Sequence, residues 1–414
     1  MSNLNNNKTS SNVEIGIFSC YNIEDYSFPR RTNMEKKNKI RILHMADMHL
    51  DSPFSRLDCE RAEIRRRELR GVFTSMMLYA KTHKADVVLI AGDLFDVGYA
   101  GEDTVSLIMR EFEKAPECRF VISAGNHDPY SARSAYKLKK FPENVYIFDS
   151  PALSCFSFDD IGVDVYGWSF VSDTLEKNPL RDKRVQDSGN IPLLCCHCDI
   201  TSASSKYAPV NVADIERFGA VYSALGHIHR HEGIRRFTSG AAYGYSGCPA
   251  GRSYDECGAG GAYIADIERR ADGTCSVSVA FEQFSVSSYE DDTLDMTGIM
   301  TREQAAERVA AFVREARYTE HTSLRLTLTG LTGAGVGTLD AFSAQDLGLF
   351  SLEIRDRTSP AYDRERFMMD MTVRGAFYRV LAPMLESEDE EQRRIASEAL
   401  RVGFAALDGS DITR

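Results

Sequence analysis

The sequence has no uninterrupted apolar run that approaches the roughly eighteen residues needed to cross a membrane. Residues 1–12 are polar and rich in Asn and Ser, and they lack the charged and apolar regions of a signal peptide. An excess of basic residues is also missing, since the formal net charge is -12. We therefore expect a cytoplasmic protein that is neither exported nor membrane-bound, and that does not coat nucleic acid by charge alone.

A disulfide framework is not expected either. The ten cysteines are scattered through 414 residues, apart from three that crowd together at Cys195, Cys196 and Cys198. This distribution fits reduced thiols better than paired ones. There is no internal repeat, and the only biased segment is the Asn-rich beginning.

Short apolar runs alternate with stretches of helical spacing from residue 40 onward. The apolar runs are Ile40–Ala46, Val87–Ala91, Phe120–Ser123, Leu193–Cys196 and Val221–Leu225. The first three are separated by residues 61–81 and 102–114, which have helical spacing. This alternation predicts a layered α/β fold. The Gly-rich turns of residues 240–261 predict antiparallel strands that complete a second sheet, giving two sheets flanked by helices.

The composition changes near residue 287, where we expect a smaller α+β domain to begin. Thr301 and Gln304 form a capping-box pattern before a helix, and Leu324, Leu326 and Leu328 alternate as in a strand. A last helix is expected to end near Gly409. We therefore predict a disordered leader at 1–38, with Met34 as an alternative start, a main domain at 39–286, and a C-terminal domain at 287–414.

Each of the five apolar runs ends in a residue type that binds metal ions. These residues are Asp47 and His49, Asp93, Asn126 and His127, His197, and finally His227 and His229. In α/β folds, functional side chains gather at the carboxyl ends of the strands. Asp, Asn and His offer oxygen and nitrogen ligands, and a shared carboxylate can hold two cations roughly 3.5 to 4 Å apart. Asp93 is the candidate for the shared ligand, and hydrolysis of a phosphate ester is the expected reaction.

As an ordered set, these residues resemble the calcineurin-like metallophosphoesterase superfamily. The resemblance covers residues 40–285 and implies a four-layer sandwich of two mixed sheets between helices. Residues 47–53, 92–95 and 245–247 resemble the DNA-repair exonuclease branch that includes SbcD and YhaO proteins. Residues 372–375 and 396–407 look most like YhaO.

The resemblance implies a role for individual residues. One metal would be held by Asp47, His49, Asp93 and His229, and the other by Asp93, Asn126, His197 and His227. His127 matches a histidine that contacts the scissile phosphate and protonates the leaving oxygen. Asp96 corresponds to a carboxylate that orients this histidine in some relatives, with Asp128 as the alternative partner. Substrate contacts are expected from Asn126, His127, Tyr245 and Arg252.

Three functions remain to be compared. The first is a DNA nuclease of exonuclease type, in which a hydroxide held between two metals attacks the phosphate in line. The resemblance implies that such a nuclease subunit acts together with an SbcC/YhaN-like coiled-coil ATPase. The second is a phosphatase or phosphodiesterase for nucleotides or other small esters, which the acidic balance and Asp96 favour, because some nuclease relatives carry His there. The third is a non-catalytic scaffold. Mn²⁺ is the expected metal, with Mg²⁺, Fe or Zn²⁺ as alternatives. The sequence is compatible with a homodimer but does not decide the oligomeric state.

Two other patterns have simpler interpretations. Zinc bound by Cys195, Cys196, His197 and Cys198 is disfavoured, because neighbouring residues of a strand point to opposite faces. The basic run at residues 65–67 is surrounded by glutamates, so local ion pairs are expected before a DNA contact.

Overall fold

The computed structural model of the protein describes residues 37–96, 100–333, 336, 339, 342–361 and 363–407. All of these residues belong to one compact unit of the chain. The predicted leader, apart from Lys37 and Asn38, lies outside the described residues, as do Met34 and the helix stop at Gly409. None of the helices in the described part combines the length and apolar character that a membrane span requires.

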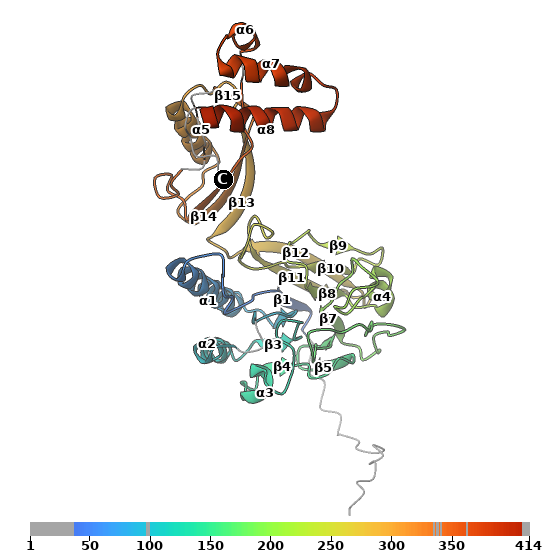
Figure 1. Ribbon diagram of the computed structural model, residues 1–414. Coiled ribbons are helices and arrows are strands. Elements are labelled where there is room, and N and C mark those ends of the chain that lie inside the picture. Colours follow the sequence, from blue (N-terminus) through green and yellow to red (C-terminus); the bar gives the residue numbers. More distant parts are fainter. Residues whose placement is uncertain are drawn as a thin grey trace, which may run out of the picture. The chain divides into compact units, whose positions relative to one another are not determined.

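The first sheet has six strands in the order β12-β11-β1-β2-β3-β4 (Figure 1). They are β1 (Lys39–Met45), β2 (Val87–Ile90), β3 (Arg119–Ile122), β4 (Val145–Ile147), β11 (Gly261–Arg269) and β12 (Cys275–Gln283). The strands from β1 to β4 are parallel, whereas β11 is antiparallel to both β1 and β12. The predicted strands at the first three apolar runs are therefore present and share one direction.

The second sheet also has six strands, in the order β5-β6-β7-β8-β10-β9. They are β5 (Ser154–Phe158), β6 (Val163–Gly167), β7 (Ile191–His197), β8 (Tyr222–Gly226), β9 (Arg235–Arg236) and β10 (Ala242–Tyr245). The strands after the Gly-rich turns, β11 and β12, are antiparallel as predicted, but the prediction that they complete this second sheet is wrong. In this sheet β6, β7, β8 and β10 are parallel, and the edge pairs β5–β6 and β9–β10 are antiparallel. After β8 the chain returns through β9, so β10 again runs in the direction of β8. The strand after the Gly-rich turns, β11, joins the first sheet instead.

Three apolar cores separate four layers, as the predicted sandwich requires. Along β1, Leu43 and Met45 face the helices α1 (Cys59–Thr82) and α2 (Glu102–Glu113), whereas Ile40 and Ile42 face the second sheet. The outer face of the second sheet packs against α4 (Val212–Phe218). Figure 1 shows α1 and α2 on one side of the paired sheets and α4 on the other. A further short helix is α3 (Ala135–Leu138).

Helix α1 begins where the sequence places a capping residue, since the Asp58 side chain accepts a hydrogen bond from the Arg61 backbone N–H. The basic run on this helix forms the expected local ion pairs. Arg65 contacts Glu68 at 2.8 Å, and Arg66 contacts Glu63 at 2.9 Å. Arg67 is the least committed of the three, since it lies 4.0 Å from Glu63 and is 66% exposed.

The C-terminal residues form a parallel sheet of three strands and four helices. The sheet has the order β13 (Ser288–Asp295), β14 (Thr322–Thr329) and β16 (Ser351–Asp356), and a two-stranded pair joins β15 (Leu331–Thr332) to β17 (Ser359–Pro360). The helices are α5 (Arg302–Glu315), α6 (Arg364–Met369), α7 (Val373–Leu385) and α8 (Glu390–Leu407). The predicted capping box of Thr301 and Gln304 is confirmed at α5. The division of the chain at residue 287 stays a prediction.

One buried histidine connects the two sheets. His44 on β1 is fully buried, its Nδ1 accepts from the Tyr222 hydroxyl at 2.9 Å, and its Nε2 donates to the Leu225 carbonyl at 3.2 Å. Burial lowers the pKa of His44 to about 3, because the charged ring would lose its hydration. Both ring nitrogens are used in these hydrogen bonds, so His44 connects the sheets and has no lone pair free for a metal.

This histidine should make unfolding dependent on pH. Its pKa in the folded state lies below the unfolded value near 6.5, so its contribution to stability is complete above that pH and falls as the pH drops toward 3. Between pH 7.5 and 5.5, the unfolding free energy of the wild type is expected to fall by about 1.4 kcal/mol more than that of His44→Gln. Urea unfolding in EDTA at both pH values measures this difference. Equal pH dependence in the two chains would contradict it.

Candidate metal centre

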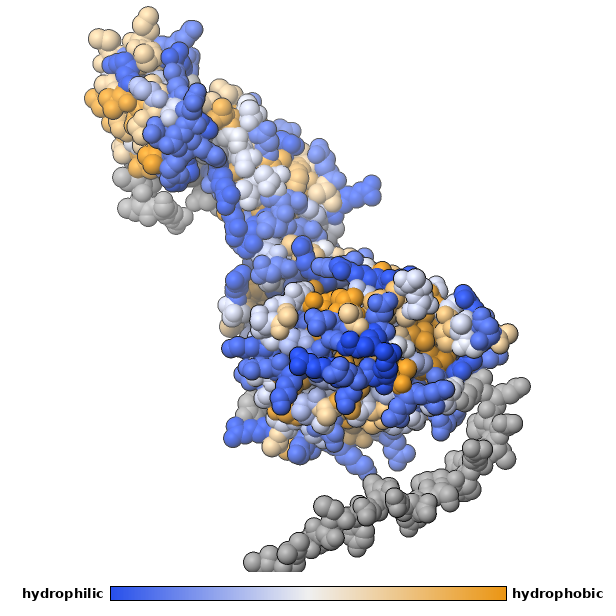
Figure 2. Space-filling model, turned by 90° about the vertical axis from the view of Figure 1, so that its right-hand side faces the viewer, coloured by the Kyte–Doolittle hydropathy of each residue, from blue (hydrophilic) through white to orange (hydrophobic). Residues whose placement is uncertain are grey.

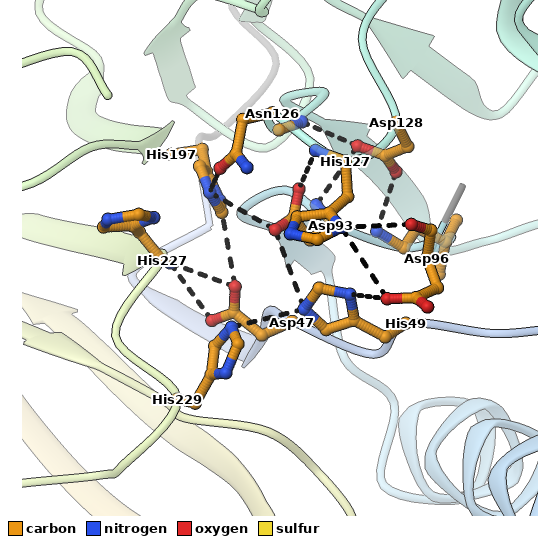
Figure 3. A network of polar contacts seen from close by, with 12 residues as sticks. Asp47, His49, Asp93, Asp96, Asn126, His127, Asp128, His197, His227 and His229 are labelled. Carbon is orange, nitrogen blue, oxygen red and sulfur yellow. Dashed lines mark hydrogen bonds and ion pairs between the residues drawn. The ribbon is translucent and has the colours of Figure 1, made fainter. Parts of the chain in front are cut away.

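The predicted ligands lie where the carboxyl ends of five strands meet (Figure 3). Those of the first sheet follow β1, β2 and β3, and those of the second come from the ends of β7 and β8. Two glycines let these sheet edges approach each other. A Cβ atom on Gly226 would lie 1.8 Å from the Ala91 carbonyl oxygen, and one on Gly92 would lie 2.3 Å from His197 Nδ1. Any larger residue would push the edges apart.

Several ligand residues have a backbone conformation that non-glycine residues rarely adopt. The φ angles are 52° at Asp47, 47° at His49, 51° at Asp93 and 114° at His227. Cross-strand hydrogen bonds hold the first two in place, from Asp47 N to Gly92 O at 3.0 Å and from His49 N to Asp93 O at 2.9 Å. Such strain persists where the surrounding structure enforces it, and it is common at functional sites.

Four of the predicted ligands form one compact group. Asp47, His49, Asp93 and His229 each place a donor atom within 4.8 Å of the others. The two Nε2 atoms of His49 and His229 are 3.3 Å apart, and His49 Nε2 is 3.6 Å from Asp93 Oδ2. The structure thus brings together the whole set that the resemblance assigns to the first metal.

The orientation of the histidine rings suits a cation. Carboxylates and carbonyls only accept hydrogen bonds, so Nδ1 donates from His49 to Asp96 at 2.9 Å, from His229 to Glu256 at 2.7 Å, and from His197 to the Ala91 carbonyl at 3.1 Å. In the neutral form, each ring then presents an unprotonated Nε2 to the centre. Burial lowers the pKa of His49, which favours this neutral form. The residues therefore fit divalent metal ions.

The second predicted group is less complete. His197 Nε2 lies 3.5 Å from Asp93 Oδ2 and 2.9 Å from Asn126 Oδ1, so these three residues come together around the shared carboxylate. His227 donates its backbone N–H to Asp47 Oδ1 at 3.0 Å, but its ring packs against His197 and Tyr207. Its ring nitrogens belong to none of the metal-type groups found among the described residues.

His127 lies at the edge of the centre. Its backbone N–H donates to Asp93 Oδ1 at 2.9 Å, and its ring packs edge-on against His49 with centroids 4.8 Å apart. The ring Nδ1 donates to the Asp96 backbone carbonyl at 3.0 Å, and the side chain is 44% exposed. Nε2 therefore stays available for a proton and a substrate oxygen.

Asp96 contacts His127 differently from the expectation. Its carboxylate accepts from His49 at 2.9 Å and lies 3.7 Å from His127 Nδ1, so His127 is held mainly by the Asp96 carbonyl. The alternative partner, Asp128, is fully used elsewhere. Its buried carboxylate accepts the backbone N–H groups of residues 93, 94, 95 and 125, and burial together with the charge of Asp93 raises its pKa to about 7.

Neither Tyr245 nor Arg252 points freely toward a substrate. The Tyr245 hydroxyl is buried, donates to the Cys198 carbonyl and accepts from Ile200 N, which argues against direct contact with a phosphate. Arg252 is only 14% exposed and contacts two carboxylates, Asp96 at 2.9 Å and Glu256 at 2.7 Å. These contacts indicate that Arg252 holds Asp96 and Glu256 in place, on the side of His49 and His229 that faces away from the candidate metal site.

Glu256 is a candidate functional residue that the sequence analysis missed. Burial opposes its charge, yet hydrogen bonds from His229 and Arg252 hold its pKa well below the usual range. The only available signal was the spacing of Arg252 and Glu256, four residues apart in a Gly-rich segment, which is common on any surface. The disfavoured cysteine zinc site gains no support, since Cys195 packs between the sheets while Cys196 and Cys198 pack beneath α4.

Comparisons with known proteins agree with this geometry. The model of the calcineurin-like phosphoesterase family matches residues 40–231. An uncharacterized metallophosphoesterase, YhaO of Bacillus subtilis, is 27% identical over 72% of this chain and 75% of its own length. The SbcD component of the SbcCD nuclease of Escherichia coli is 32% identical over 22% of this chain and 21% of its own length.

A solved dimetal phosphatase from Danio rerio aligns at 12% identity and a TM-score of 0.35, covering 59% of this chain and 99% of that one. The family match spans all the strands that carry the candidate ligands, from β1 to the end of β8. Residues 40–231 therefore form a calcineurin-like phosphoesterase domain.

Proposed function

We propose that this chain is a two-metal phosphodiesterase that cleaves DNA, as the exonuclease-type subunit of a larger nuclease. The observation that carries the proposal is the position of Asp93. Its Oδ2 atom lies 3.6 Å from His49 Nε2 and 3.5 Å from His197 Nε2, between the two ligand groups. A carboxylate in this position can serve two cations at once.

The residues of the chain define what each part of the site would do. Asp47, His49, Asp93 and His229 would hold one cation, and Asp93, Asn126, His197 and His227 the other, with Mn²⁺ as the proposed metal. When bound, the cations would neutralise the phosphoryl oxygens and supply an activated water. His127 would carry a proton on Nε2 and pass it to the leaving oxygen, while its Nδ1 stays bonded to the Asp96 carbonyl.

The choice of DNA as substrate rests on the similarity to SbcD, which covers 22% of this chain. A net charge of -12 gives little grip on a phosphate backbone, so we propose that a coiled-coil ATPase partner supplies it. The C-terminal helices suit such a contact, because Met369, Met371, Val373 and Val380 are 69–92% exposed. Figure 2 shows hydrophobic residues on this part of the surface. A cytoplasmic location stays a prediction.

A second candidate is hydrolysis of nucleotides or other small phosphate esters. The acidic balance of the chain favours it, since a small ester needs no extended basic surface. The metal centre would serve both reactions, because the same fold and site can act on different substrates.

The two candidates differ in the substrates they hydrolyse. With Mn²⁺, the purified chain is expected to degrade labelled single- or double-stranded DNA and to hydrolyse bis-p-nitrophenyl phosphate faster than p-nitrophenyl phosphate. Hydrolysis of the small esters alone would favour the second candidate. Inactivity on every substrate, with two metals shown to be bound, would indicate a required partner or a scaffold role.

A further inference from the structure

A short segment outside the predicted ligands, residues 251–258, holds the back of the metal centre. Glu256, whose side chain is 7% exposed, accepts a hydrogen bond from His229 Nδ1 at 2.7 Å. Arg252 contacts Glu256 at 2.7 Å and Asp96 at 2.9 Å, and Asp96 accepts from His49 Nδ1. An unbroken chain of hydrogen bonds and ion pairs therefore runs from His229 through Glu256, Arg252 and Asp96 to His49.

Both ends of this chain belong to the same ligand group. His49 and His229 lie with Asp47 and Asp93 around one point, and their Nε2 atoms are 3.3 Å apart. A carboxylate on Nδ1 fixes the tautomer and the angle of a ligating ring. Arg252 lies between the two carboxylates and offsets their repulsion, so a single guanidinium keeps both rings directed at the same place.

The segment itself is held by strands of the C-terminal sheet. The Tyr254 ring lies under the guanidinium of Arg325 on β14, at 4.0 Å, and packs edge-on against Tyr289 of β13. The Gly258 N–H donates to the Tyr289 carbonyl at 3.1 Å. Strands far from the ligands in sequence thus determine where Arg252 and Glu256 can lie.

We propose that Glu256 and Arg252 are positioning residues for the metal site of Asp47, His49, Asp93 and His229, and that β13 and β14 hold them in place through Tyr254. The inference rests on the proposed two-metal function. It predicts an effect confined to one of the two metals, because the contacts of His197 and Asn126 do not involve this segment. If Arg252 and Glu256 only stabilised the turn, their replacement would lower the folding stability and leave the affinity for both metals unchanged.

The test is a calorimetric titration of the full, metal-free chain with Mn²⁺ alone. The wild type is expected to bind two ions. Glu256→Gln, Glu256→Ala and Arg252→Met should each weaken one of them by about 10- to 100-fold and leave the other unchanged. Tyr254→Ala, which removes no atom of the Arg252–Glu256 pair, should weaken the same ion by a smaller factor. Glu232→Gln is the matched control, because Glu232 is exposed and its ion pair within the described part of the chain is a local one with Arg235.

Urea unfolding of each variant in EDTA measures its folding stability without metal, so that a loss of metal affinity can be told from a loss of stability. Glu256→Gln keeps the shape of the side chain and replaces Glu256→Ala if the alanine variant is too unstable. Two ions bound with wild-type affinity in Glu256→Gln and Arg252→Met would overturn the inference and leave the proposed function intact. Equal weakening of both ions would also overturn it. Unchanged binding in Tyr254→Ala alone would remove the role of β13 and β14. A wild type that binds no Mn²⁺ would contradict the proposed function and the inference together.

Discussion

Replacement of Asp93 by asparagine is expected to abolish metal-dependent hydrolysis. The amide preserves the shape of the side chain and can still accept the His127 N–H, but it removes the charge that two cations would share. Because two-metal sites contribute several kcal/mol of charge stabilisation, the rate should fall by about 1000-fold or more. Initial rates on DNA and on bis-p-nitrophenyl phosphate with Mn²⁺ measure the loss.

Metal content distinguishes this effect from misfolding. After gel filtration, Asp93→Asn should retain fewer than two equivalents of Mn²⁺ and still elute as the wild type does. Asp173→Asn is a suitable control, because Asp173 is exposed and belongs to none of the metal-type groups found among the described residues. A rate above about one-tenth of wild type would show that Asp93 is not the shared ligand, since that loss corresponds to only about 1.4 kcal/mol.

Replacement of His127 by alanine should reduce DNA cleavage by about 100- to 10,000-fold, the usual range for loss of a general acid. The same variant should lose much less activity on bis-p-nitrophenyl phosphate, because nitrophenolate leaves readily without a proton. The backbone N–H of residue 127 still donates to Asp93 in the variant, and the side chain is no predicted ligand. Metal binding should therefore be unchanged.

The comparison of the two substrates is the informative measurement for His127. Equal loss on DNA and on the nitrophenyl ester would mean that the ring binds phosphate or supports the fold, and that proton transfer is not its role. Loss of a metal ion in the variant would place His127 among the ligands. His83→Ala controls for removal of an exposed imidazole, because His83 lies at the end of α1 and stacks on Tyr79.

The grouping of the candidate ligands was largely predictable, because most of them follow the ends of strands. A buried run such as that of β2 can be recognised by its apolar residues, and the polar residue that follows must lie at the edge of the sheet. Parallel strands bring these edges together, so Asp47, Asp93 and Asn126 could be grouped before their distances were known. The set of Asp47, His49, Asp93 and His229 came from the family resemblance, because His229 follows a strand of the other sheet.

The contacts that were not predicted depend on which elements pair. Alternation along β11 shows which residues are buried, but it does not show that the strand returns to β1 instead of extending the second sheet. The bond between Glu256 and His229 joins residues that only this return of the chain brings close together. The Asp96 carboxylate lies 2.9 Å from His49 Nδ1 and 3.7 Å from His127 Nδ1, so its choice of partner depends on a difference of less than 1 Å. Patterns of residue type carry no such information.

Gly92 and Gly226 impose a constraint that is separate from catalysis. Both are required by the close approach of the two sheet edges, whether or not cations are present. Selection on the fold and selection on the chemistry can therefore act on different positions. A related chain that keeps both glycines but has lost the equivalents of Asp93 and His197 would retain the architecture without the capacity for hydrolysis. In related sequences, the residues at positions 92, 226, 93 and 197 could therefore distinguish members that are still enzymes from members that keep the fold only as a binding scaffold.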